Sequence, residues 1–272
     1  MRLSFTKMHG AGNDFVLIDN RNNQVSLTPS QITQICDRHY GVGADGFLLV
    51  ETAQNGGDFR MRYYNRNGQE AEMCGNGARC FTRYTQHISG SRQKTFSFET
   101  LAGHIQARLL GANVVATQIS APTGYRSHTL QIAGTIEKVQ SLNVGVPHAV
   151  IFVENVENLD IPRRGSEIRF HEAFTPLGTN VNFVHIVSTN HLRIRTYERG
   201  VEAETLACGT GAAACALIYH LHQSVPPPIH ITVQGGDTLQ VTFEHEHLPD
   251  FQNVCVSGPA DFVFNGEIEI SE

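Results

Sequence analysis

The sequence predicts a mixed α+β protein made of two similar halves. Three observations support this prediction: short strand-like runs between glycine turns, a smaller number of helix-like stretches, and a motif that occurs twice about half the chain apart. The chain has 272 residues, 40% of them hydrophobic. That is enough for one large domain or for two medium ones with separate cores.

Five runs are predicted as strands, and two of them alternate apolar side chains with arginine, the period of a half-buried strand. The runs are 15–19, 47–51, 59–63, 149–154 and 192–196. A helix is expected to begin at Pro29, with Thr28 as its N-cap and Gln31 closing a capping box. Stretches 76–87 and 209–222 are also predicted as helices, and the second of them is rich in alanine.

Composition argues against several kinds of partner. The net charge of −6 gives no basic surplus for nucleic acid or an anionic membrane. The longest apolar stretch, 212–218, is too short to span a bilayer, and the first residues lack the features of a secretion signal. Six cysteines without a C-x-x-C pair indicate thiols in a reducing compartment. We expect a cytoplasmic protein.

The internal repeat organises the chain. YNRNGQEAEMCGNGARC at 64–80 matches YERGVEAETLACGTGAAAC at 197–215. Each copy has a tyrosine, then a glycine, then E-A-E, then C-G-x-G-A at the start of a predicted helix. A repeat of this length indicates two similar halves, and we expect the two C-G-x-G-A turns to face each other across a cleft.

The repeated cysteines, Cys74 and Cys208, have the chemistry of an acid and base pair. The positive field at a helix N-terminus favours a thiolate, and the following glycines let a carboxylate approach backbone N–H groups. One thiolate could remove an α-proton while a thiol on the opposite face delivers another, with both helix N-termini stabilising the carbanion. The sequence thus predicts a cofactor-independent amino-acid epimerase.

Pyridoxal phosphate is the main rival explanation for such a reaction. It requires a Schiff-base lysine, and the chain has only Lys7, Lys94 and Lys138. Lys94 and Lys138 lie in polar contexts typical of the surface. Lys7 is the one plausible candidate, and no phosphate-binding loop accompanies it. We therefore expect no cofactor.

The remaining cysteines and the paired histidines are interpreted as structural or surface residues. Cys36, Cys80, Cys215 and Cys255 lack the glycine context, and Cys80 and Cys215 are expected to face the core. The pairs His220/His222 and His245/His247 have loose spacing, so surface histidines are expected in preference to a metal site.

Five motifs together resemble the diaminopimelate epimerase family over essentially the whole chain. They are KMHGAGNDF at 7–15, HYGVGADG at 39–46, MCGNGARC at 73–80, YERG at 197–200 and ACGTGA at 207–212. The resemblance implies interconversion of LL- and meso-diaminopimelate without cofactor, in lysine and peptidoglycan-precursor biosynthesis. It also implies a homodimer.

The resemblance further implies two pseudo-symmetric domains of the diaminopimelate epimerase-like fold. In this fold each domain is a curled sheet around a central helix, and the active site lies in the cleft between the domains. On this sequence the first half is expected over 1–118, joined by the C-terminal strand 259–272, and the second over 119–258.

Roles for individual residues follow from the same resemblance. Cys74 and Cys208 would be the two bases, with His148 and Glu198 each supporting a cysteine. The reacting carboxylate would be held by Gly75, Asn76, Gly209 and Thr210. The rest of the substrate would be held by Asn13, Asn65, Asn180 and Arg199, with Arg199 on the distal carboxylate through a bidentate fork.

Alternatives remain open for several of these residues. Apart from the resemblance, Asn13 and Asn65 could be turn residues, Arg199 a solvated charge and His148 a satisfied core histidine. Two departures from the family pattern, Val146 and Gly46, affect substrate recognition more than proton transfer. The competing functions are a racemase of another amino acid, a phenazine-pathway type of isomerase with a carboxylate base, and a non-catalytic amino-acid-binding module.

Overall fold

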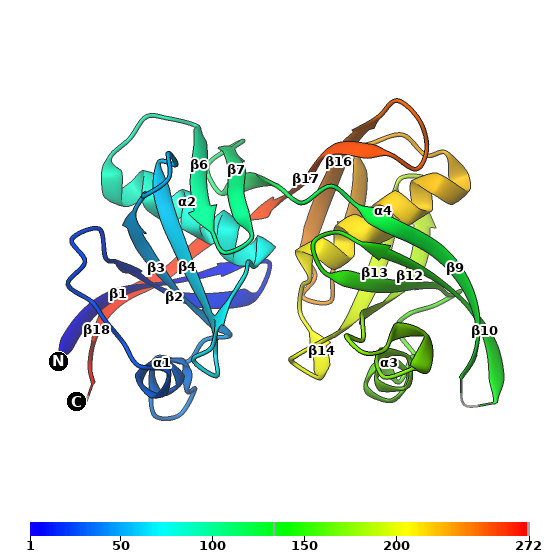
Figure 1. The fold of residues 1–272 in the computed structure, drawn as a ribbon, viewed down its shortest axis with the longest axis horizontal. Coiled ribbons are helices and arrows are strands. Elements are labelled where there is room, and N and C mark those ends of the chain that lie inside the picture. The colour runs from blue at the N-terminus through cyan, green and yellow to red at the C-terminus, as the bar shows by residue number, and fades with distance from the viewer. Residues whose placement is uncertain (133, 271–272) are drawn as a thin grey trace. The chain divides into compact units, whose positions relative to one another are not determined.

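The computed structural model describes residues 1–132 and 134–270 of the chain. Contacts between Cα atoms divide the chain into two compact units. Unit 1 comprises Met1–Thr117 and Gly258–Glu272, and unit 2 comprises Gln118–Ser257. Both units contain helices and a sheet (Figure 1), so the predicted α+β class is confirmed.

Unit 1 contains the helices and strands of the first part of the chain together with the last strand. Its strands are β1 (Arg2–Gly10), β2 (Asn13–Asp19), β3 (Gly46–Thr52), β4 (Phe59–Asn65), β5 (Glu70–Ala71), β6 (Thr95–Thr100), β7 (Gly103–Leu109), β8 (Val114–Gln118) and β18 (Asp261–Glu269). Its helices are α1 (Pro29–Cys36) and α2 (Gly75–Ser89).

Unit 2 contains the remaining elements, and the strands β8 and β17 each cross the boundary between the units at their last residues. Its strands are β9 (Thr123–Ile132), β10 (Thr135–Asn143), β11 (Pro147–Phe152), β12 (Asn180–Ser188), β13 (His191–Glu198), β14 (Ala203–Thr205), β15 (Ile229–Thr232), β16 (Thr238–His245) and β17 (Phe251–Pro259). Its helices are α3 (Ile161–Arg169), the short 3₁₀ turn η1 (Glu172–Phe174) and α4 (Gly209–Gln223).

The two units repeat one strand topology. In unit 1, β2 is parallel to β3, β4 is antiparallel to both β3 and β5 and parallel to β6, and β7 follows β6 and precedes β8 in antiparallel pairs. In unit 2, the strands β11 to β17 pair in the same order and with the same directions. The predicted repeat is therefore a repeat of whole sheets.

The register of the two sheets also matches, which gives a position-by-position correspondence. Phe15 pairs with Gly46 in unit 1 as His148 pairs with Asn180 in unit 2. Phe47 pairs with Tyr64, and its counterpart Val181 pairs with Tyr197. Side chains at equivalent places can therefore be compared directly.

In each unit the antiparallel strand next to β2 or β11 has a second neighbour, and this neighbour comes from a different part of the sequence in the two units. In unit 1, β1 is antiparallel to β2 and to β18, and in unit 2, β10 is antiparallel to β11 and to β9. The strand β18 therefore fills in unit 1 the place that β9 fills in unit 2. Because β18 follows all the strands of unit 2 in the sequence, unit 1 is formed by two separate segments of the chain.

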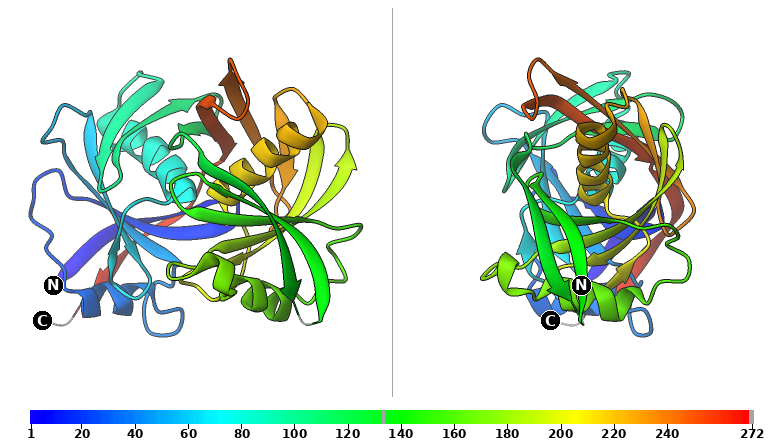
Figure 2. Two further views of the ribbon diagram at one scale, coloured as in Figure 1. Left: turned by 45° about the vertical axis from the view of Figure 1, so that its right-hand side comes forward. Right: turned by 90° about the vertical axis from the view of Figure 1, so that its right-hand side faces the viewer.

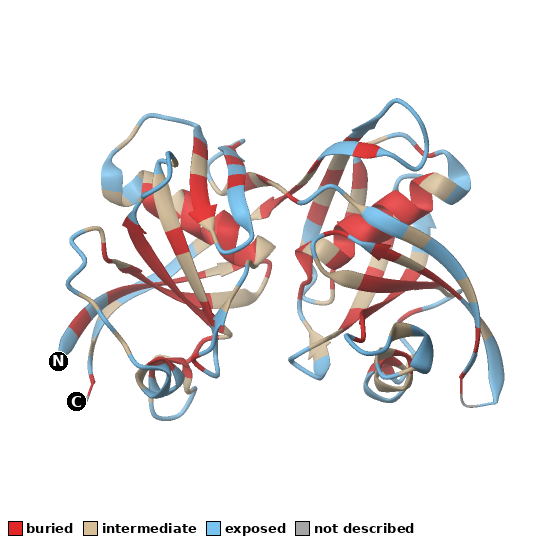
Figure 3. Cartoon of the chain, viewed as in Figure 1, coloured by how far each residue is buried: buried red, intermediate tan, exposed pale blue. Residues whose placement is uncertain are grey.

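Each unit encloses one helix within its sheet, as Figures 1 and 2 show for α2 and α4. The helix α2 contacts β1, β2, β3, β4 and β7, and α4 contacts β10, β11, β12, β13, β15 and β16. Residues on nearly all sides of α4 are buried, which Figure 3 shows as an almost continuous red helix. A helix that is apolar all round belongs in a core, and this explains its alanine-rich sequence.

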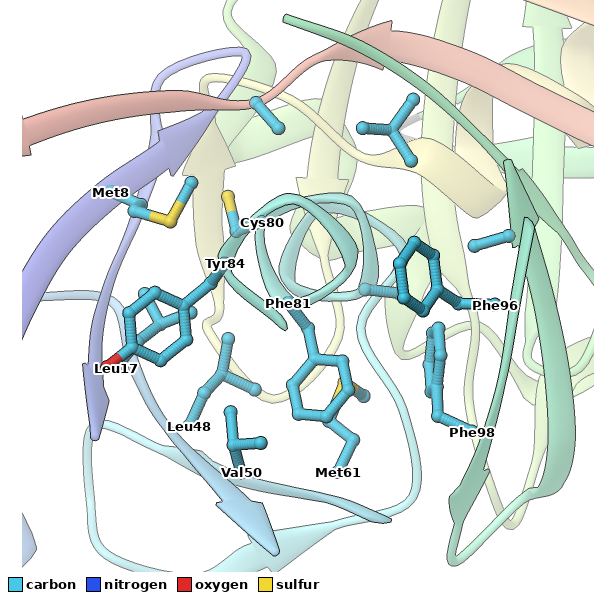
Figure 4. Packing of buried hydrophobic residues seen from close by; sticks show 14 of the residues in the cluster. Met8, Leu17, Leu48, Val50, Met61, Cys80, Phe81, Tyr84, Phe96 and Phe98 are labelled. Atoms are coloured by element: carbon cyan, nitrogen blue, oxygen red, sulfur yellow. The ribbon is translucent and has the colours of Figure 1, made fainter. Parts of the chain in front are cut away.

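The strands of unit 1 are covered on both faces. Leu17 and Leu48 pack against α2 in one cluster, whereas Val16 and Phe47 pack on the opposite side with the residues of α1. Figure 4 shows Cys80, Phe81 and other side chains of α2 among strand residues of the first cluster. Strands buried on both faces show continuous rather than alternating hydrophobicity, as β3 does.

Most predicted elements are confirmed. The helix at Pro29 has Thr28 as its N-cap with a complete capping box, and stretches 76–87 and 209–222 lie in α2 and α4. The run 192–196 alternates as predicted, because Leu192, Ile194 and Thr196 are buried and the two arginines are only partly so.

One strand prediction needs correction in its bounds, and another is confirmed. The run 149–154 ends at Phe152, because Asn155 accepts a hydrogen bond from the Glu157 N–H (2.8 Å) in a local turn. The run 59–63 alternates as predicted, because Phe59, Met61 and Tyr63 pack in the α2 cluster and the two arginines are only partly buried.

Three of the cysteines interpreted as structural are buried, and two of the lysines are exposed, as expected. Cys80 and Cys215 are fully buried, and burial raises the pKa of both thiols well above the usual value. Burial also raises the pKa of Cys36, to about 12. Lys94 and Lys138 are exposed.

One histidine was predicted wrongly. His220 is buried, with its Nδ1 2.7 Å from the Val225 carbonyl and its ring against Phe243 and Phe251, because α4 lies inside the sheet almost to its end. Its neighbours His222, His245 and His247 are exposed, as predicted. In the described part of the chain, no helix has the length and apolar character needed to cross a membrane.

Replacement of Phe81 by alanine should destabilise unit 1 by about 3–5 kcal/mol, because it empties a fully buried aromatic site in the α2 cluster. Urea unfolding followed by circular dichroism measures this change. The matched control is Phe170→Ala, since Phe170 is 61% exposed and should matter little. Equal losses for both variants would contradict the packing described for α2.

Candidate functional site

Cys74 caps the N-terminus of the enclosed helix α2. Its backbone is extended (φ −134°), and its Sγ accepts a hydrogen bond from the Gly77 N–H at 3.5 Å. The thiol lies 3.6 Å from Asn13 Oδ1, to which it can donate. The side chain is only partly buried, so the sulfur is held by its own helix and by one amide of β2.

Cys208 caps α4 in the same way. Its Sγ accepts a hydrogen bond from the Gly211 N–H at 3.3 Å and lies 3.5 Å from Thr210 Oγ1. Cys208 is 8% exposed, so it is more enclosed than Cys74. Each cysteine follows the short strand, β5 or β14, that precedes its helix, which makes the two positions topologically equivalent.

Each cysteine directly precedes its helix, so its thiol lies beside backbone N–H groups that can bind an anion. The N–H groups of a first helical turn have no acceptor inside the helix, and the dipole adds positive potential there. Gly75, Asn76, Gly209 and Thr210 are the first residues of these helices. Each unit therefore carries a thiol beside a site suited to a carboxylate.

The glycines next to the two cysteines differ in how much space a side chain would have. A Cβ at Gly211 would come within 2.4 Å of Asn182 Oδ1, so this glycine permits close packing of α4 on β12. A Cβ at Gly77 would only touch Phe15, at 3.4 Å. A Cβ at Gly75 would meet nothing within 4 Å, so packing does not explain this glycine.

The amide of Asn13 is fixed in orientation by a carboxylate. Asn13 Nδ2 donates to Asp45 Oδ2 at 3.0 Å, and Asn13 Oδ1 accepts from Asn76 Nδ2 at 3.1 Å. Asn76 Oδ1 in turn accepts from the buried Arg79 at 2.7 Å. Because a carboxylate can only accept, the Asn13 oxygen must face the Cys74 side.

A charged network that the sequence motifs did not predict surrounds Asp45, the partner of Asn13. Arg38 bonds both Asp14 and Asp45 at 2.8 Å, and Lys7 pairs with Asp14 at 2.6 Å. Burial raises the pKa of Asp14, but hydrogen bonds from Arg38 and Lys7 outweigh it and lower the pKa to about 2. Lys7, the lysine that pyridoxal phosphate would need, is thus buried in an ion pair.

This network explains the KMHGAGNDF and HYGVGADG motifs, which contribute Lys7, Asp14 and Asp45. The available signal was a lysine and two aspartates in two glycine-rich motifs. The parallel pairing of β2 with β3 brings the two motifs together. This pairing cannot be seen in the sequence.

His148 is fully buried on β11 in unit 2. Its Nδ1 lies 3.1 Å from Asn182 Nδ2. Burial, and then the positive charge of Arg199, lower the pKa of His148 to about 3. The imidazole is therefore neutral at physiological pH, so it differs from a histidine that exchanges protons near pH 7.

The other predicted residues of unit 2 lie at the ends of its strands. Asn180 accepts a hydrogen bond from the Arg199 N–H at 2.9 Å and donates to the Pro147 carbonyl at 3.0 Å. The guanidinium of Arg199 donates to the Leu177 carbonyl at 3.3 Å. Glu198 accepts from the Thr205 hydroxyl at 2.9 Å. Asn180 thus ties together the backbone that carries His148 and Arg199.

Asn65 is exposed at the end of β4, where its Oδ1 accepts from the Tyr63 hydroxyl at 2.8 Å. Gly46 pairs with Asn65 across the sheet, and a Cβ at Gly46 would come within 2.7 Å of the Tyr63 ring. Tyr63 therefore occupies the space that a side chain at position 46 would need.

The structure thus brings some predicted residues together within each unit. In unit 1, Asn13, Cys74 and Asn76 are in contact, while Asn65 is bonded to Tyr63 instead. In unit 2, Cys208 contacts Thr210, and Asn180 contacts Arg199.

The fold of this chain is shared with solved structures of low sequence identity. A solved structure described as a probable proline racemase from Agrobacterium radiobacter shares the fold, with a TM-score of 0.76 over 99% of this chain and 93% of that one. The two sequences are 13% identical, so this likeness concerns the fold alone.

Sequence relatives give the family. The sequence model of the family described as "Diaminopimelate epimerase" matches residues 5–122 and 140–263. A diaminopimelate epimerase of a Hydrogenobaculum species is 42% identical over 96% of both chains, and one of Aquifex aeolicus is 40% identical over 98% of both. The chain belongs to the diaminopimelate epimerase family, whose members are isomerases independent of pyridoxal phosphate.

The glycine geometry gives a prediction for stability. Gly211→Ala should cost about 1–3 kcal/mol, because its methyl group collides with Asn182. Gly75→Ala should leave stability unchanged or slightly higher, since its methyl group meets no atom. Urea midpoints of the two variants test this, and a larger loss at Gly75 would disprove the packing difference.

Proposed function

We propose that this chain interconverts LL- and meso-diaminopimelate by two-base proton transfer at the α-carbon, with Cys74 and Cys208 as the bases. The pathway is lysine and peptidoglycan-precursor biosynthesis. The observation that carries the proposal is the equivalent placement of the cysteines: each caps the enclosed helix of its unit, after equivalent strands and within the repeated motif.

The reaction needs one cysteine as thiolate and the other as thiol. The thiolate takes the α-proton from one face, the electron pair delocalises toward the α-carboxylate, and the thiol returns a proton on the opposite face. The α-proton is much less acidic than a thiol, so the developing charge needs fixed stabilisation. First-turn N–H groups of Gly75, Asn76, Gly209 and Thr210 supply it without reorganisation.

His148 and Glu198 each support a cysteine in this proposal. The low pKa of His148, about 3, makes it a neutral hydrogen-bonding group rather than a second titrating base. Glu198 corresponds in register to Asn65 of unit 1, because their neighbours Tyr197 and Tyr64 occupy equivalent places. The two units therefore offer different polar groups at matching positions.

The rest of the substrate is assigned to Asn13, Asn65, Asn180 and Arg199. Arg199 presents a guanidinium for the distal carboxylate, where two parallel hydrogen bonds suit its planar fork. Asn180 supports this role because its amide is bonded to the Arg199 N–H and to Pro147. The Asn13 oxygen, fixed by Asp45, is suited to accept from an ammonium group.

The cysteine pair gives the central test. Cys74→Ala and Cys208→Ala should each abolish epimerisation, because inversion needs an acid and a base. The double variant should be hardly worse than either single one, since the pair acts as a unit. The assay is conversion of LL- to meso-diaminopimelate, together with deuterium uptake at the α-carbon in heavy water. Cys36→Ala, at another cysteine outside the motif, is the control.

The outcomes separate the competing functions. Near wild-type turnover in either single variant would eliminate the two-cysteine mechanism. Binding of amino acids by the wild type without any deuterium uptake would instead identify a non-catalytic binding module.

Arg199 tests the choice of substrate. Arg199→Lys should lower kcat/KM for diaminopimelate by about 10- to 100-fold, because a bidentate hydrogen-bonded pair is lost. Arg163→Lys serves as control, since Arg163 is an exposed residue of α3. Equal activity of the wild type on alanine and diaminopimelate would show that no distal carboxylate is recognised, and would favour a racemase of another amino acid.

A homodimer in the cytoplasm remains our prediction for the working form. Light scattering coupled to size-exclusion chromatography would give the oligomeric state, and a single-chain mass at assay concentration would contradict the dimer.

A further inference from the structure

A chain of three buried polar side chains crosses the sheet of unit 2. His148, Asn182 and Thr196 lie on the neighbouring strands β11, β12 and β13 and are 0%, 0% and 3% exposed. Thr196 Oγ1 donates to Asn182 Oδ1 at 2.9 Å. Asn182 Nδ2 lies 3.0 Å from the Ala149 carbonyl and 3.1 Å from His148 Nδ1.

The surroundings fix which way the Asn182 amide points. A backbone carbonyl can only accept a hydrogen bond, so the amide nitrogen must face Ala149. The same nitrogen then directs its second hydrogen at His148 Nδ1. The amide oxygen is left to Thr196. All the polar atoms of Asn182 are therefore used within this buried chain.

The tautomer of His148 follows from this orientation. Since Asn182 donates to Nδ1, that nitrogen must be the unprotonated acceptor, and a neutral imidazole then carries its hydrogen on Nε2. In the described residues, the buried Nε2 has no hydrogen-bond partner. Burying a hydrogen-bond donor without a partner costs free energy of folding. The Nε2–H group is therefore expected to have a functional role.

Unit 1 shows that the fold does not need the polar chain. The positions equivalent to His148, Asn182 and Thr196 are Phe15, Leu48 and Tyr63. Phe15 and Leu48 are fully buried in the same kind of sheet around the same kind of helix. Because Phe15 and Leu48 fill the two central positions in unit 1, the polar pair His148 and Asn182 in unit 2 indicates a functional role.

We propose that Asn182 is a positioning residue that holds His148 as the neutral Nε2–H tautomer, so that His148 acts in the reaction only as a hydrogen-bond donor. The proposal rests on the proposed catalytic support by His148. Burial of the imidazole and the nearby charge of Arg199 act in the same direction, because both oppose a second proton on the ring.

The test determines the tautomer of His148 from long-range ¹⁵N–¹H correlation spectra. The His148 ring signal is assigned by its loss in His148→Gln. The wild type is expected to show Nε2 protonated and Nδ1 bare at neutral pH. In Asn182→Asp, which keeps the size of the side chain, a carboxylate faces Nδ1 and should draw a proton onto it. The expected kcat falls about 100-fold, as a wrong histidine tautomer is costly in catalysis.

The matched control is Asn20→Asp in unit 1. Asn20 is also a buried asparagine, 2% exposed, whose amide bonds the backbone of Val25 and donates to Glu51 Oε1 at 3.3 Å. This variant introduces a buried acid beside another carboxylate, at a comparable or larger cost in stability, but should keep the wild-type tautomer and kcat. It therefore separates a loss of stability from a loss of positioning.

Two results would overturn the proposal. One is a wild-type His148 protonated on Nδ1, and the other is an Asn182→Asp variant whose tautomer and kcat are both unchanged. A failure of the proposed function is distinguishable, because it would appear as a wild type that neither epimerises diaminopimelate nor exchanges its α-proton, whatever the spectra show.

Discussion

The first turn of an enclosed helix is the feature on which the rest of this protein depends. A helix surrounded by a curled sheet cannot tilt or slide without disrupting the packing around it, so its N-terminus stays where the sheet puts it. Both enclosed helices begin at a cysteine whose sulfur accepts an N–H from the third helical residue. The same packing that stabilises each unit therefore fixes one thiol and one set of backbone donors.

The two units share a frame but differ in the side chains placed on it. Unit 1 supports its cysteine with amides, and the Asn13 amide is oriented by a network of two aspartates, an arginine and a lysine. Unit 2 has a buried histidine, a glutamate and an arginine at the ends of the corresponding strands. If the two cysteines act as proposed, each would therefore work among different polar side chains.

Part of this organisation could be predicted from the sequence. The repeated motif identified the two cysteines, and their position before predicted helices was confirmed because glycine turns and helix starts are local features. The capping box at Thr28 was predicted for the same reason. Burial of Cys80 and Cys215 was also predicted, since a cysteine inside a helix is commonly a small buried side chain.

What depends on pairing between distant strands could not be predicted in this way. The sequence by itself determined the two halves, the cysteines and the family motifs, because these are written in neighbouring residues. Only the tertiary structure decided that Lys7, Arg38 and Asp45 stand behind Asn13, that His220 is buried, and that Asn182 contacts His148. The parallel pairing of β2 with β3 and of β11 with β12 brings residues together that lie about 30 apart in the chain, and local patterns contain no record of that register.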